Sequence, residues 1–141
     1  MRDLNAVILH CTATTKDREL TVKEIRKWHT SPPRNWRDIG YHFVIMQDGT
    51  VERGRHIKHI GAHTLHINAQ SVGVAYCGGV DAEGNAKDTM TIKQVKAFRE
   101  LYKGLVTIFG DLELKGHNDF NQKKECPSFK VKEKFHDLIN T

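Results

Sequence analysis

Two histidines and a cysteine in this chain, His10, His117 and Cys126, are of the types that bind a catalytic metal ion. Imidazole nitrogens and thiolate sulfur are donors that zinc prefers, and a catalytic zinc takes three protein ligands and keeps a fourth position for water. His10 and His117 each end a short apolar run, and Cys126 follows His117 after a loop. In a chain with nine histidines such a triple also arises by chance; the alternative is a core His10, an exposed His117 and an unreactive Cys126.

The elements that would hold these residues follow from hydrophobic periodicity. Four segments have the apolar runs of strands, and the second is a hairpin around Asp48-Gly49: 5–11, 41–53, 71–79 and 112–117. Three segments have helical spacing: 21–29, 91–110 and 128–140. The order predicts a mixed α/β fold, in which a central mixed sheet of about five strands is flanked by about three helices. His10, Tyr41 and His117 then lie at strand ends, where ligands bind in such sheets.

Length and composition indicate a single globular domain over residues 1–141. The net charge of +5 and the pI near 9.2 favour an anionic partner, and nucleic acid, acidic lipid and bacterial cell-wall polymer all qualify. The basic residues lack the flanking aromatic platforms of a groove that binds single strands, so nucleic acid is not the expected partner.

The cysteines and the N-terminus bear on the compartment. Three widely spaced cysteines form no disulfide framework and suit a reducing environment, and Cys11 and Cys77 are expected in the core. No apolar run is long enough to insert in a membrane, and the N-terminus lacks the apolar core and cleavage site of a secretory signal. We therefore expect a cytoplasmic protein that another component must release if it acts outside.

Six ordered motifs give a family resemblance. They are ILHCTAT (8–14), GYHFVI (40–45), DGTVERGR (48–55), GAH (61–63), SVGVAYCGG (71–79) and KKECPSF (123–129). Together they resemble the zinc-dependent N-acetylmuramoyl-L-alanine amidases of the type 2 amidase family, which share the peptidoglycan-recognition-protein fold. The nearest likeness is to the small phage lysozymes of amidase specificity.

The resemblance implies one zinc ion bound by His10, His117 and Cys126, with Tyr41 and Lys124 as catalytic residues that do not bind the metal. The loop before the cysteine is one residue longer than in the phage enzymes, which leaves Lys123 as the alternative to Lys124, although the Lys-x-Cys spacing favours Lys124. The substrate contacts to be expected are His63 on the rim of the groove, with Trp36 and Asn68; for Trp36, ordinary loop packing is the alternative.

The implied reaction is hydrolysis of the amide between the lactyl group of N-acetylmuramic acid and L-alanine in peptidoglycan, by a monomeric phage or prophage endolysin. Zinc suits this chemistry because it lowers the pKa of a bound water from about 15.7 to about 7. No glutamate has a clear role as general base. Two other functions stay open from the residues: a peptidoglycan-binding module without catalysis, and a cysteine hydrolase that uses Cys126 or Cys11.

Overall fold

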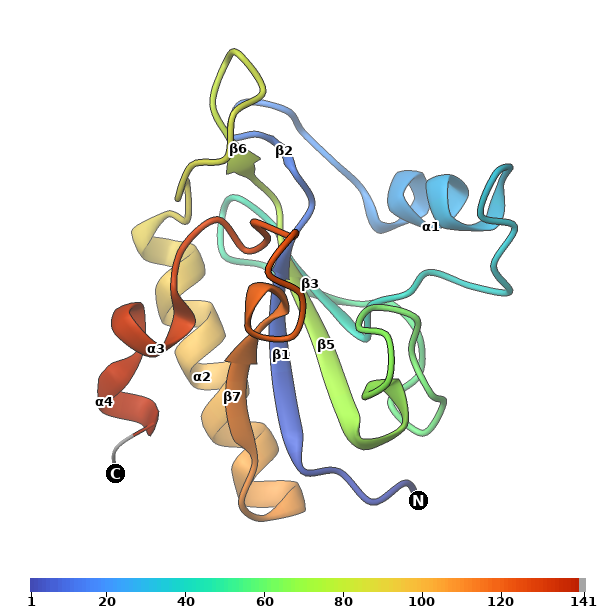
Figure 1. Cartoon of the computed structure of the whole chain (residues 1–141), viewed down its shortest axis with the longest axis vertical. Helices are drawn as coiled ribbons and strands as arrows, with labels where there is room; N and C mark the ends of the chain where they lie inside the picture. The colour runs from blue at the N-terminus through green and yellow to red at the C-terminus, as the bar shows by residue number, and fades with distance from the viewer. Residues whose placement is uncertain (140–141) are drawn as a thin grey trace.

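A five-stranded sheet forms the centre of the computed structural model, which describes residues 1–139 (Figure 1). The strand order is β4-β3-β5-β1-β7. The bounds are Ala6–Cys11 for β1, Phe43–Ile45 for β3, Val51–Arg53 for β4, Ser71–Tyr76 for β5 and Glu113–Gly116 for β7. All neighbouring pairs are parallel except β3 and β4, which form the expected hairpin. The carboxyl ends of β1, β5 and β7 therefore lie at one edge of the sheet.

Within residues 1–139, four α-helices and two short 3₁₀ turns accompany the sheet. They are α1 (Val22–Thr30), α2 (Ile92–Phe109), α3 (Val131–Lys134), α4 (His136–Ile139), η1 (Asn68–Gln70) and η2 (His117–Asp119). Thr21 caps α1 by accepting the backbone N–H of Glu24, and Thr91 and Gln94 form a complete capping box at α2. Both N-termini therefore lie where the sequence predicts them. Among the described residues, no helix has the length and apolar character needed to cross a membrane.

Alternation along β1 divides the core between the two faces of the sheet. Val7, Leu9 and Cys11 pack in the larger cluster, which includes Phe98 of α2 and Phe135. The smaller cluster joins Val22 and Ile25 of α1 to Val44 and Cys77. Because successive strand residues point to opposite faces, His10 is directed away from the α2 side, and Cys11 is a core residue as expected.

The mixed sheet and its flanking helices confirm the predicted fold class, with two differences. The closing segment 128–140 is not one helix, since α3 ends where Phe135 leaves helical geometry and turns its buried ring against Phe98 and Phe129. Residue 140 lies outside the described part of the chain. A small second sheet, β2 (Thr14–Thr15) with β6 (Gly79–Val80), was not expected, because two-residue strands leave no periodic signal.

Candidate metal centre and active site

His10, His117 and Cys126 meet at the carboxyl edge of the sheet. One potential ligand atom from each lies within 4.8 Å of the other two. Strand register brings the histidines together, because Leu9 pairs with Gly116 and each histidine follows one member of that pair. Their ring centroids are 4.6 Å apart. The predicted triple is therefore a real cluster, built from two adjacent parallel strands and a returning loop.

The loop that returns Cys126 is fixed by hydrogen bonds on both sides. Asn118 donates its backbone N–H to the Cys126 carbonyl at 2.9 Å, which closes the loop on itself. The Tyr76 hydroxyl, from β5, donates to the Pro127 carbonyl at 2.7 Å. The thiol sulfur itself accepts the backbone N–H of Cys11 at 3.0 Å. Cys126 is therefore attached to the strand that carries His10, although it lies 116 positions after His10 in the sequence (126 − 10).

Burial keeps the imidazoles of the cluster neutral. It lowers the pKa of His10 well below its usual value, with a further contribution from His63 and His117. It also lowers the pKa of His117, assisted by the charge of Lys124. Only a neutral imidazole can offer a lone pair to a metal, so both histidines are in the form that binds one.

The sulfur of Cys126 is under opposing influences. Its hydrogen bond with Cys11 and its burial raise the pKa of the Cys126 thiol, whereas the Cys11 N–H and the Lys124 charge lower it. The hydrogen bond from Cys126 in turn lowers the pKa of Cys11 to about 7. A divalent cation held here would favour the Cys126 thiolate, as coordination does for thiols in general.

The donor set fits zinc. Two neutral imidazoles and one thiolate match the three-ligand arrangement of catalytic zinc sites, and the tetrahedral bond lengths of about 2.0–2.3 Å suit ligand atoms a few ångströms apart. Among residues 1–139, this is the group of His, Cys, Asp and Glu side chains whose spacing could hold a metal ion.

Tyr41 lies beside the cluster. Its ring centroid is 5.3 Å from that of His10 and 5.4 Å from that of His29 on α1. Burial raises the pKa of Tyr41, so the phenol keeps its proton. His29 also accepts the backbone N–H of Gly40 through Nδ1 at 2.9 Å, which fixes the residue just before Tyr41.

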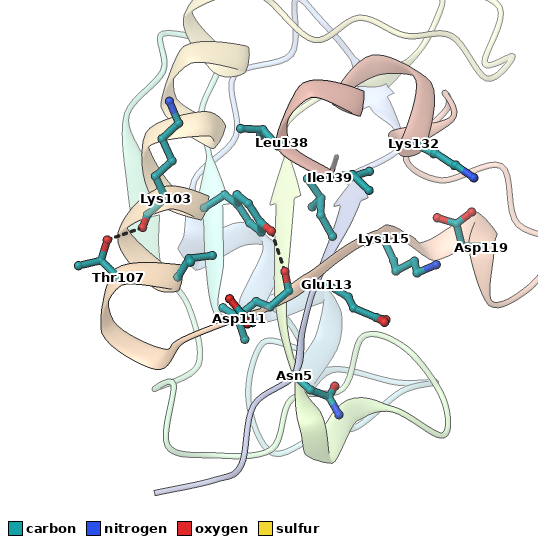
Figure 2. A pocket seen from close by; sticks show the side chains of 14 residues that line it. Asn5, Lys103, Thr107, Asp111, Glu113, Lys115, Asp119, Lys132, Leu138 and Ile139 are labelled. Carbon is teal, nitrogen blue, oxygen red and sulfur yellow. Dashed lines mark hydrogen bonds between the residues drawn. The ribbon is translucent and has the colours of Figure 1, made fainter. Parts of the chain in front are cut away.

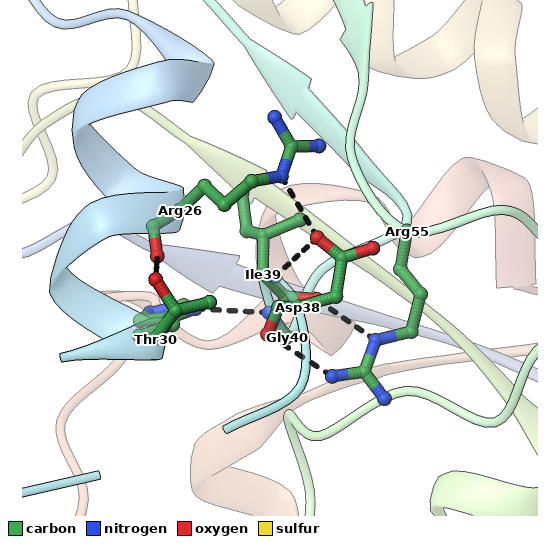
Figure 3. Close-up of polar contacts among 7 residues, drawn as sticks. Arg26, Thr30, Asp38, Ile39, Gly40 and Arg55 are labelled. Atoms are coloured by element: carbon green, nitrogen blue, oxygen red, sulfur yellow. Dashed lines mark hydrogen bonds and ion pairs between the residues drawn. The ribbon is translucent and has the colours of Figure 1, made fainter. Parts of the chain in front are cut away.

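A polar network fixes the segment that leads to Tyr41 (Figure 3). Asp38 accepts from Arg26 Nε at 2.8 Å and from the Ile39 N–H at 2.7 Å. Arg55 donates to the Ile39 carbonyl at 2.9 Å and to the Asp38 carbonyl at 3.1 Å. A Cβ on Gly40 would lie 2.1 Å from the Ala62 carbonyl oxygen, so only glycine fits this close approach. Tyr41 is thus held by packing and hydrogen bonds that involve α1 and two loops.

The two lysines before Cys126 differ in their relation to the cluster. Both are exposed, but the charge of Lys124 acts on the pKa of His117 and of Cys126. The backbone N–H of Lys123 bonds to the Asn121 side chain at 3.0 Å, within the loop. Of the two lysines, Lys124 is therefore the one whose charge acts on His117 and Cys126.

Three further residues were expected to contact substrate. His63 is only 8% exposed and its Nδ1 lies 2.9 Å from His10 Nε2, so the structure places it in the interior beside His10 and not exposed on a groove rim. Asn68 uses its side-chain oxygen to accept the backbone N–H groups of His63 and Thr64, at 2.9 and 2.8 Å. Trp36 is partly buried and packs edge-on against His29.

Sequence reasoning missed the supporting residues Ser71, Gly73 and Thr64, which surround His63. The short GAH motif marks the histidine, but nothing in the periodicity of residues 54–70 indicates that its ring points inward. Ser71 and Gly73 belong to a separate strand, β5, and their contacts with His63 depend on how the loop folds onto that strand.

A large hollow lies elsewhere, at the outer edge strand β7 between α2 and the α3–α4 segment (Figure 2). It has a volume of about 1070 Å³ and a mixed lining that includes Lys103, Glu113, Lys115 and Lys132. None of the three potential metal ligands lines it. The volume of a hollow therefore does not identify the candidate active site, whereas the cluster of potential ligand atoms does.

Comparisons with known proteins agree with this site. A family model described as N-acetylmuramoyl-L-alanine amidase matches residues 1–129. The endolysin of Klebsiella phage KP32 is 40% identical over 131 residues, which cover 93% of this chain and 85% of that protein. The solved N-acetylmuramoyl-L-alanine amidase LysC from Clostridium intestinale URNW has a TM-score of 0.80 at 29% identity, over 96% of this chain and 87% of that one. Peptidoglycan recognition protein-LE has been solved in complex with tracheal cytotoxin (monomeric diaminopimelic acid-type peptidoglycan). It has a TM-score of 0.76 at 26% identity, over 90% of this chain and 75% of that one.

Proposed function

The chain belongs to the N-acetylmuramoyl-L-alanine amidase family, and we propose that its activity depends on one zinc ion bound by His10, His117 and Cys126. The protein is a peptidoglycan amidase related to phage endolysins. The bond that such an enzyme hydrolyses joins the lactyl group of N-acetylmuramic acid to L-alanine. Bound at this cluster, zinc would supply a Lewis acid for the carbonyl and would lower the pKa of a water to about 7.

The remaining chemistry is assigned to Lys124 and Tyr41. Attack on an amide carbonyl places negative charge on its oxygen, and this charge needs a cation or a hydrogen-bond donor nearby. Lys124 carries a positive charge that acts on two of the three ligands, and Tyr41 offers a protonated hydroxyl beside His10. Both are therefore proposed to stabilise the oxyanion.

Substrate contact is proposed for two residues near the centre. Trp36 is partly exposed on the loop before Tyr41. The side-chain oxygen of Asn68 accepts two backbone N–H groups, so its amide nitrogen is the group that we propose contacts substrate. The net charge of +5 suits an anionic cell-wall polymer. We propose that the protein acts as a monomer on peptidoglycan after its release to the wall.

The observation that carries this proposal is the convergence of two imidazoles and one thiol from distant segments within 4.8 Å. Substituting serine for the cysteine (Cys126→Ser) removes the soft donor while keeping the size of the side chain. The variant should lose bound zinc and amidase turnover, measured by metal analysis of purified protein and by release of muropeptides from sacculi. A full equivalent of zinc on Cys126→Ser would refute the ligand set, and binding to sacculi without release by the unaltered protein would indicate a binding module.

A further inference from the structure

The imidazole of His63 packs against the backbone of two glycines, in space that a side chain at either position would fill. A Cβ on Gly73 of β5 would lie 2.5 Å from both Cγ and Cδ2 of His63, and a Cβ on Gly61 would lie 2.8 Å from Cδ2. Real Cβ atoms do not approach so closely, so a side chain at either position would displace the ring. The missing side chains of the two glycines therefore leave space for the imidazole, whose Nδ1 lies 2.9 Å from His10 Nε2.

The hydrogen bonds around this ring determine which nitrogen carries the proton. The Ser71 hydroxyl donates to the Ile67 carbonyl at 2.8 Å. This is the shorter of the two contacts of the hydroxyl, so its single proton points to Ile67 and Ser71 Oγ accepts at its 3.3 Å contact with His63 Nε2. His63 is thus protonated at Nε2, and its Nδ1 is a lone-pair acceptor. At 2.9 Å from that lone pair, His10 Nε2 must be the donor.

We propose that His63 is a positioning residue for the metal centre, which accepts a hydrogen bond from His10 Nε2 and so leaves His10 Nδ1 as the nitrogen that binds zinc. The inference rests on the zinc site proposed above. Metal-binding histidines usually donate their second N–H to a carboxylate or a carbonyl, and this outer contact fixes tautomer and ring orientation. Here a neutral imidazole takes that place, and Ser71 and the Ile67 carbonyl orient it in turn.

Thr64 is the competing acceptor. Its hydroxyl lies 3.2 Å from His10 Nε2 and 2.9 Å from His63 Nδ1. The contact between the two imidazoles is the shorter of the two that His10 Nε2 makes, so His63 is its principal acceptor. Thr64, which could only donate to the unprotonated His63 Nδ1, is a secondary partner of both rings. Because both nitrogens of His63 have partners and the ring is buried, His63 acts through His10 and not on the substrate.

Nuclear magnetic resonance of the metal-free protein tests the hydrogen bond directly. In ¹⁵N-labelled protein we expect His10 and His63 both as Nε2–H tautomers, with a coupling across the hydrogen bond from His10 Nε2 to His63 Nδ1. The coupling should be lost in His63→Leu and kept in Thr64→Val. A lone pair on His10 Nε2, or a coupling absent from the unaltered protein, would overturn the proposal.

Zinc affinity, measured by competition with a chromophoric chelator, tests the consequence. His63→Leu removes the acceptor and should weaken zinc binding by about 10- to 100-fold, the range found for outer partners of metal ligands. His63→Asn puts an amide oxygen where Nδ1 was and should restore affinity to within about threefold. Thr64→Val, the matched control, should bind zinc like the unaltered protein.

The outcomes separate this inference from the proposed zinc site. If the unaltered protein binds no zinc, the zinc site itself is wrong. If it binds zinc tightly and His63→Leu, folded by circular dichroism, binds equally well, only the role of His63 is wrong. Should His63→Leu fail to fold, Ser71→Ala tests the same chain of donors: weaker zinc binding than in Thr64→Val is expected, and unchanged binding would overturn the proposal.

Discussion

Substituting alanine for Gly73 should destabilise the protein, whereas the same substitution at Gly104 should stabilise it. Gly73 lies in the middle of β5, and the Cβ of an alanine there would lie 2.5 Å from two ring atoms of His63. Gly104 lies within α2, and a Cβ there meets nothing within 4 Å. Neither glycine has a positive φ, so the two substitutions differ in space and not in backbone strain.

The size of the effect at Gly73 follows from the displacement that is needed. Carbon atoms in contact lie about 3.5–4.0 Å apart, so the His63 ring must move by about 1 Å. Such a shift lengthens the 2.9 Å contact with His10 beyond hydrogen-bond range and leaves the buried His10 N–H only its longer, 3.2 Å contact with the Thr64 hydroxyl. Overpacking costs about 1–3 kcal/mol and a poorly satisfied buried donor up to about 1–3 kcal/mol more. The lower chain entropy of alanine in the unfolded state offsets only about 0.4–1 kcal/mol.

Urea denaturation of the metal-free proteins, followed by circular dichroism, measures both effects. Gly73→Ala should lower the free energy of unfolding by about 1–5 kcal/mol, and Gly104→Ala should raise it by about 0.5–1 kcal/mol, as expected for an exposed helical glycine. If Gly73→Ala is as stable as the unaltered protein, the close packing of His63 against Gly73 is refuted.

Two further predictions concern catalysis and acid stability. Lys124→Ala should keep its zinc but lose about 10²–10³ in turnover, while Lys123→Ala should stay near normal; equal losses in the two variants would refute the assignment. His29 has its pKa lowered to about 4 by burial and by Arg34 and Arg55. Between pH 6.5 and about 4 the unfolded chain therefore binds a proton that the folded protein excludes, so unfolding free energy falls as pH falls. In His29→Asn, whose amide oxygen can still accept the Gly40 N–H, that slope should decrease by up to about 1.4 kcal/mol per pH unit, and an unchanged slope in denaturation at several pH values would contradict it.

The clustering of His10, His117 and Cys126 could be predicted because their positions depend on strong local patterns. The buried run of β1 and the short run of β7 place His10 and His117 near strand ends, and parallel pairing then brings both to one edge. The family motifs selected Cys126 from three cysteines. The capping residues Thr21 and Thr91 likewise fixed the starts of α1 and α2, since capping depends on residues three positions apart.

The surroundings of His63 could not be predicted, because they depend on tertiary contacts without a local signal. Residues 54–70 have no periodicity, and the ring's place is set by the missing side chain of Gly73, on another element. The break at Phe135 has the same origin: helical spacing continues through the segment, but packing of this ring between Phe98 and Phe129 prevails over it.

The central claim is that zinc at the His10–His117–Cys126 cluster enables cleavage of the amide next to muramic acid. The most direct measurement is the identity of the new chemical ends formed in purified sacculi. The sacculi are treated with protein from which a chelator has removed the metal, with and without added zinc. The account predicts free L-alanine amino groups, formed only when zinc is restored, and no new reducing sugar. New reducing ends would contradict it, and so would amino ends that form equally well without added zinc.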